Sequence, residues 1–130
     1  MNARMLVIID ALLAVVACSK PDVPKSSPGP AQSKISFVNT VWAVAQSKQA
    51  ELGSLRVFLS DGTLVMTSPN AKPAFGNWRQ DGDRLTITEE GLDYDVDVLE
   101  LTHDAFRIRM HNPGEPVEIL FKPATAENIP

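Results

Sequence analysis

The sequence contains very few of the residues that form disulfide or metal frameworks. It has one cysteine and two histidines, His103 and His111. A single cysteine excludes an internal disulfide, and neither histidine has a second ligand at the spacing of zinc sites. Its serines gather in proline-rich or turn segments, without a nucleophile-elbow motif. We therefore predict a non-enzymatic chain that has no metal, no cofactor and no catalytic residue.

The chain also lacks an excess of positive charge, since its formal net charge at pH 7 is −4. Nucleic-acid-binding proteins usually present a basic face, and proteins held at membranes by charge carry clusters of lysine and arginine. Neither class fits this composition. With 130 residues, of which 44% are hydrophobic, the chain is long enough and apolar enough for one domain with its own core.

Long hydrophobic runs are missing as well. The longest, Met5–Ala17, is too short to span a bilayer, which needs about 20 apolar residues. It follows Arg4 and ends in the small residues VVA immediately before Cys18. A positive start, an apolar run and small residues at the cleavage site are typical of a secretory signal peptide. We predict such a signal peptide over residues 1–17.

The sequence VVAC at residues 15–18 resembles the lipobox of bacterial lipoproteins. In that family the cysteine is lipidated on its sulfur and becomes the first mature residue. The resemblance implies palmitate-type acyl chains on Cys18 and durable anchoring, because two or three chains bind far more stably than one. Ser19, in place of aspartate, implies export to the outer membrane, facing the periplasm. The alternative is a buried N-terminal helix that ends in an ordinary core cysteine.

The segment after Cys18 is rich in proline, serine and lysine: SKPDVPKSSPGPAQSK, residues 19–34. Such a composition buries too little apolar surface to offset the entropy of ordering, so it predicts a flexible linker. We expect a lipidated cysteine and disordered linker over residues 18–36, a β-barrel domain over 37–123 and a C-terminal tail over 124–130.

Short β-rich runs follow at intervals of roughly ten residues, separated by turn signals such as Asp61-Gly62. Connections this short permit only antiparallel neighbours. The predicted fold is all-β, an eight-stranded antiparallel up-and-down barrel that closes on itself. The runs cover residues 40–46, 54–60, 63–68, 75–80, 84–89, 92–101, 105–111 and 117–123.

Alternation along these runs predicts which side chains share a face. Leu55, Val57 and Leu59 form one face of their run, with Arg56 and Ser60 on the opposite face. Val98, Leu99 and Leu101 cannot all share a face, which predicts a β-bulge near Val98-Leu99. The aspartates of DYDVD, residues 93–97, are spaced as in a calcium loop but alternate with apolar residues as in a strand. We expect them to form cross-strand ion pairs with Arg107 and Arg109.

The sequences NTVW (39–42), FLSDGTLVMT (58–67), GNWRQDGDRLTI (76–87) and LTHDAFRIRM (101–110) resemble the strands and hairpins of small bacterial lipocalin-like domains. The resemblance covers about residues 37–122 and implies a barrel that binds a small apolar molecule at its mouth. Another eight-stranded envelope module, such as the META domain of heat-shock lipoproteins, is the alternative.

Two roles follow for the large side chains. Trp42 is predicted to close the barrel base under a basic side chain supplied by Arg107, Arg109 or Lys122. A ligand-pocket rim is predicted beside the longest loop, Ser68–Ala74, from Met66, Pro69, Phe75 and Trp78.

The interior residues are mostly bulky, which favours a filled barrel. Two functions therefore stay open for a monomer with no nucleic-acid partner. One is binding of a small apolar ligand. The other is docking of an envelope protein, as an inhibitor or assembly factor.

Overall fold

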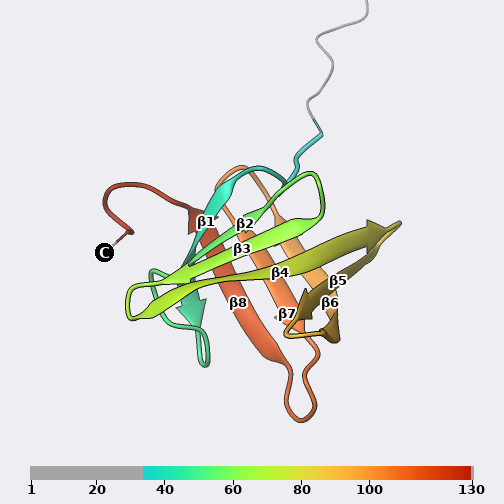
Figure 1. The fold of residues 1–130 in the computed structure, drawn as a ribbon. Helices are drawn as coiled ribbons and strands as arrows, with labels where there is room; N and C mark the ends of the chain where they lie inside the picture. The colour runs from blue at the N-terminus through green and yellow to red at the C-terminus, as the bar shows by residue number, and fades with distance from the viewer. Residues whose placement is uncertain (1–33, 130) are drawn as a thin grey trace, which may run out of the picture. The chain divides into compact units, whose positions relative to one another are not determined.

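The computed structural model describes residues 34–129 and shows a closed antiparallel barrel (Figure 1). Strands follow one another around it in chain order, and β1 pairs with β8 to close it. The predicted all-β, eight-stranded up-and-down barrel is confirmed, and residues 34–129 contain no helix. The interpretations of the signal peptide, Cys18 and the linker up to residue 33 lie outside the described residues. The strands are β1 (Val41–Ser47), β2 (Leu55–Phe58), β3 (Thr63–Ser68), β4 (Ala71–Asp81), β5 (Arg84–Glu89), β6 (Leu92–Leu101), β7 (Phe106–Met110) and β8 (Val117–Pro123).

One end of the barrel, which we call the closed end, is filled by aromatic side chains. Phe106 is fully buried, and its ring centroid lies 4.9 Å from that of Phe37 and 5.7 Å from those of Phe58 and Phe121. Trp42 also packs on Phe106, at 5.4 Å, and Trp78 packs on Phe37 and Phe58, so six aromatic side chains form one contact network. Offset and edge-to-face contacts of this kind stabilise a core beyond the burial of apolar area.

This closed end is also where the described chain enters the barrel (Figure 1). The indole nitrogen of Trp42 donates a hydrogen bond to the Phe37 carbonyl at 2.9 Å. The indole nitrogen of Trp78 donates to the Leu59 carbonyl, in the β2–β3 connection, at 2.8 Å. Both tryptophans therefore tie their polar edges to backbone at the closed end, as buried indoles require.

The alternation predicted for β2 is confirmed, since Leu55 and Val57 share one face and Arg56 lies on the other, but the apolar face is the one that lies outside the barrel. Arg56 is opposite Trp42 on β1 and Met66 on β3, and Phe58 is opposite Leu64, so these residues point into the barrel. Leu55 and Val57 are only partly buried and lie on the outer wall. The physical reason is that Phe58, with no exposed surface, packs in the aromatic network. Burying that ring turns Arg56 inward, because side chains two apart share a face.

The predicted long loop over Ser68–Ala74 is wrong. Strand β4 begins at Ala71, so only Pro69 and Asn70 connect it to β3. The register shifts from Met66 opposite Ala74 to Ser68 opposite Ala71, which places one additional residue in β4. Pro73 lies within this bulge, where its missing N–H does not interrupt a regular ladder.

The bulge predicted near Val98-Leu99 is confirmed. The register of β6 against β7 shifts between Val98 and Glu100, so Leu99 is the additional residue. This shift lets Leu101 stand opposite the buried Phe106 while Val96 stands opposite Met110.

The outer wall carries ion pairs, but not those predicted for the DYDVD aspartates. Arg109 bonds to Glu118 on β8, with Nη2 and Oε1 2.6 Å apart, and Arg107 lies 3.7 Å from Glu100. Asp97 instead contacts His111, with 2.7 Å between Oδ2 and Nε2. Asp93 contacts Arg79 at 3.2 Å and accepts a hydrogen bond from Thr88. The partners differ because long side chains reach diagonally or to the strand on their other side.

These contacts predict loss of stability in acid. The Arg109 hydrogen bond lowers the pKa of Glu118 from its ordinary 4.5, and the Thr88 hydrogen bond, followed by that of Arg79, lowers the pKa of Asp93 from 3.8. A carboxyl with a lowered folded-state pKa stabilises the fold above its unfolded pKa and loses that contribution as pH falls through the folded value. We expect the urea midpoint to fall with pH below about 4.5, and Glu118→Gln to flatten that fall.

The matched control is Glu115→Gln, an exposed acid that forms no ion pair within residues 34–129. Equal pH profiles for Glu118→Gln and the unmodified chain would contradict this assignment.

Candidate functional site at the barrel mouth

A recess of about 450 Å³ opens at the end of the barrel opposite the closed end. It is bordered by the β1–β2, β3–β4 and β5–β6 connections, all of which lie at one end because the strands are antiparallel. We call it the mouth recess. Its lining residues are Gln49, Ala50, Glu51, Ser54, Arg56, Met66, Thr67, Ser68, Ala71, Lys72, Ala74, Phe75, Glu89, Glu90 and Tyr94.

Arg56 provides the inward-facing positive charge of the mouth recess. It stands between Trp42 and Met66, two buried residues on the neighbouring strands. Burial lowers the pKa of the Arg56 guanidinium, and the Glu89 carboxylate acts in the opposite direction. Within residues 34–129, Arg56 has no carboxylate at ion-pair distance and no side-chain hydrogen bond. A guanidinium in this position can bind a planar anion by donating two parallel N–H hydrogen bonds to it.

Three acids surround the recess, and they differ in what they already contact. Glu51 accepts a hydrogen bond from Asn70, which ties the β1–β2 connection to the β3–β4 turn. Glu89 follows the buried Leu85 and Ile87 on the inward face of β5. Glu90 is exposed in the two-residue turn before β6.

The turn at Glu90-Gly91 is strained. Both residues have positive φ angles, 52° and 79°. A non-glycine side chain in this region costs about 1–2 kcal/mol, and Asn-Gly or Asp-Gly is preferred in such hairpin turns. Positive φ at both central residues is the regular geometry of a two-residue hairpin turn, so the strain is confined to Glu90. Here it lies directly at the edge of the mouth recess.

Nine of the fifteen lining residues of the recess are polar or charged, and the apolar part of its surface comes mainly from Met66, Ala74 and Tyr94. Met66 is 8% exposed, and Ala74 opposite it is too small to cover it. Tyr94 is partly buried on β6, opposite Ile87 on the inward face. The recess therefore combines an apolar surface with one inward guanidinium, which suits a small molecule that has both an apolar part and a polar group.

The predicted rim residues are distributed between the two ends. Met66 and Phe75 line the mouth recess. Pro69 is exposed in the β3–β4 turn at the same end but outside the lining. Trp78 packs at the closed end, 5.3 Å from the ring of Phe37, away from the recess. Trp42 is buried, and the basic residue opposite it is Arg56, whereas Lys122 stands opposite Ala43.

Arg56, Glu89 and Tyr94 were missed by the sequence interpretation. A signal for Arg56 was present in the Asp61-Gly62 hairpin. Residues that stand opposite each other in a hairpin share a face, so an inward Leu64 and Met66 require an inward Phe58 and Arg56.

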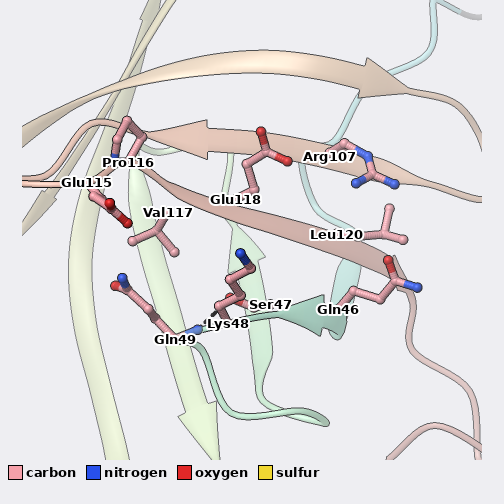
Figure 2. Close-up of a pocket in the computed structure, with 10 residues that line it drawn as sticks. All are labelled: Gln46, Ser47, Lys48, Gln49, Arg107, Glu115, Pro116, Val117, Glu118 and Leu120. Atoms are coloured by element: carbon pink, nitrogen blue, oxygen red, sulfur yellow. Dashed lines mark hydrogen bonds between the residues drawn. The ribbon is translucent and has the colours of Figure 1, made fainter.

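A second hollow, of about 540 Å³, lies on the outer wall beside β8 (Figure 2). Figure 2 shows Lys48 and Gln49, which follow β1, facing the segment Glu115–Val117 that leads into β8. Leu120 is its most buried outward side chain, at 8% exposure. A bulge in β1 between Val44 and Gln46 shifts its register against β8 beside this groove.

The groove is a weaker site for a small molecule than the mouth recess. Two of its charges are already paired, because Glu118 bonds Arg109 and Arg107 lies near Glu100. Exposed pairs of this kind contribute little, and they leave no desolvated charge for a ligand. The mouth recess, in contrast, holds a partly buried cation without a direct counter-ion.

Within residues 34–129, no group of three or more histidine, cysteine, aspartate or glutamate side chains is arranged to hold a metal ion. In the same part of the chain there is no helix long and apolar enough to cross a membrane. No protein-family model, no curated protein and no solved structure matches this chain.

Proposed function

We propose that this protein is a lipid-anchored binding protein of the bacterial cell envelope and that its barrel binds a small, largely apolar molecule in the mouth recess. The observation that supports ligand binding most is the recess itself. It holds about 450 Å³ over the apolar floor of Met66, and small-molecule sites typically measure about 300–1,000 Å³.

Ligand binding is tested by thermal denaturation of the full chain with a panel of small hydrophobic molecules. A ligand at 100 times its Kd stabilises the folded state by about 2.7 kcal/mol, which is measurable as a higher Tm. Ala74→Phe fills the space above Met66 and should abolish this shift. Ala126→Phe, a substitution in the exposed C-terminal tail, is the matched control and should retain it. A panel without any shift would remove the support for ligand binding.

Anchoring is proposed from the lipobox resemblance at Cys18, and it is tested in cells. We expect Cys18→Ser to move most of the protein out of the membrane fraction, because a thiol is required for lipid attachment. Blocking the lipoprotein signal peptidase with a globomycin-type inhibitor should make a larger precursor accumulate. Ser19→Ala keeps the thiol and is the control for membrane attachment. Unchanged size under the inhibitor, together with membrane-bound Cys18→Ser, would show that the proposed localisation is wrong.

Docking of an envelope protein is the second candidate function, and a row of apolar side chains on the outer wall favours it. Val41, Val57, Val65 and Phe75 stand opposite one another across β1 to β4. Phe75 is 70% exposed and Val41 43%. A photo-crosslinking residue at position 41, which lies in this row and outside the lining of the mouth recess, should then capture one envelope protein that has a complementary apolar face. A residue placed at position 84, on the outward face of β5, is the control.

A further inference from the structure

We propose that the ligand of the mouth recess carries a single negative charge, a carboxylate, which binds the Arg56 guanidinium while the apolar part lies over Met66 and Ala74. This inference rests on the proposed function, because it defines the chemical class of the molecule that the same recess binds.

The position of Arg56 is the first argument. Its strand neighbours Trp42 and Met66 are 1% and 8% exposed, so the guanidinium emerges from an apolar surrounding and not from the outer wall. A charge in such a place is weakly screened by water, and a directly bonded counter-ion is worth more there than on the surface. Within residues 34–129 no carboxylate supplies that bond. A ligand carboxylate can supply it with two parallel hydrogen bonds.

The surrounding acids limit the ligand to one negative charge. Arg56 and Lys72 are the basic residues of the lining, and Glu51, Glu89 and Glu90 are its acids. The acids outnumber the cations, so the field at the edge repels a second negative charge on the ligand. A single carboxylate that contacts Arg56 directly is still attracted, because a charge-assisted bidentate hydrogen bond is strong. The Glu89 carboxylate, which attracts Arg56, competes with the ligand carboxylate for the guanidinium.

The remaining surface of the recess selects an apolar body. Met66 forms the floor, Ala74 leaves room above it, and Tyr94, opposite Ile87 on the inward face, contributes aromatic surface. A straight-chain or aromatic monocarboxylate of modest length combines one carboxylate for Arg56 with an apolar body. A diacid of the same length does not, since its second charge would meet the acidic edge.

The experiment is an NMR titration of the full chain carrying Cys18→Ser with three six-carbon probes: hexanoate, 1-hexanol and the diacid adipate. We expect hexanoate to bind roughly tenfold more tightly than 1-hexanol, as expected for one charge-assisted bidentate contact. Adipate should bind more weakly than hexanoate. Arg56→Met should abolish the preference for hexanoate over 1-hexanol. Arg79→Met, which removes an exposed arginine of the outer wall, is the control and should keep it.

Glu89→Gln should raise the affinity for hexanoate, whereas Arg56→Met should lower it. A loss of folding cannot produce such an increase. Removal of the competing carboxylate should tighten hexanoate binding about threefold or more and leave 1-hexanol unchanged. Equal affinities for hexanoate and 1-hexanol would overturn the inference and leave the proposed function standing. Hexanoate binding that is unchanged in Arg56→Met would also overturn the inference. Absence of binding by all three probes would overturn both.

Discussion

Phe106→Ala is expected to lower the free energy of unfolding by about 3–5 kcal/mol, the largest effect of any single substitution considered for this barrel. Phe106 has no exposed surface and contacts the rings of Phe37, Trp42, Phe58 and Phe121. Its removal loses the transfer free energy of the ring and leaves a cavity bordered by rigid aromatic side chains. Such a cavity cannot collapse easily, so its cost adds to the transfer term.

Urea denaturation followed by tryptophan fluorescence measures this effect, because Trp42 packs directly on Phe106. Phe75→Ala is the matched control. It is the same substitution at a side chain that is 70% exposed on the outer wall, and it should change stability by no more than about 0.5 kcal/mol. Similar losses for both variants would show that the aromatic network does not hold the closed end together. For a domain with a typical stability of about 5–15 kcal/mol, the Phe106 variant would be close to unfolding.

Gly76→Ala is expected to destabilise the barrel by about 3 kcal/mol, although it adds a single methyl group. A Cβ at this position would lie 2.5 Å from the Thr88 carbonyl oxygen, a backbone atom of β5. It would also lie 3.6 Å from the terminal methyl of Met66, the floor of the mouth recess. A flexible side chain could move away, but a backbone carbonyl in a paired strand can move only if the sheet does. Glycine is therefore required by close approach of two strands, since its φ is not positive.

Gly82→Ala separates this steric effect from the loss of glycine itself. A Cβ at position 82 meets no heavy atom within 4 Å, but φ is +59° there, so the variant carries only the cost of the left-handed conformation, about 1 kcal/mol. The two variants are compared by their urea midpoints at equal protein concentration. A smaller loss for Gly76→Ala than for Gly82→Ala would contradict the close approach of β4 and β5.

Local sequence features predicted the strands and many of their connections correctly. Alternation and the Asp61-Gly62 turn depend on residues within one hairpin, and the structure places a strand in every predicted run. The bulge at Val98-Leu99 was also predictable, because three apolar residues in β6 could not share one face of a regular strand. Closure followed from eight sequential antiparallel strands, whose edges would otherwise stay unpaired.

Alternation alone could not predict which face of β2 is buried or which side chains form ion pairs on the outer wall. Leu55 and Val57 on one face, and Arg56 and Phe58 on the other, each give an acceptable alternation. The side chains alone therefore do not decide which set is buried. The choice depends on Phe37 and Phe106, which lie far from Phe58 in the chain and meet it only in the closed barrel. The candidate site depends on this choice, because it is the burial of Phe58 that turns Arg56 inward.

The sequence by itself determined an all-β fold, the number of strands and their antiparallel order, since these follow from side-chain periodicity and short turns. Only the tertiary structure decided which face of β2 is buried, that the closed end is filled by aromatic rings, and that the other end forms a recess with an inward arginine. The physical reason is that periodicity is a local property, whereas burial is settled by packing between strands distant in the chain.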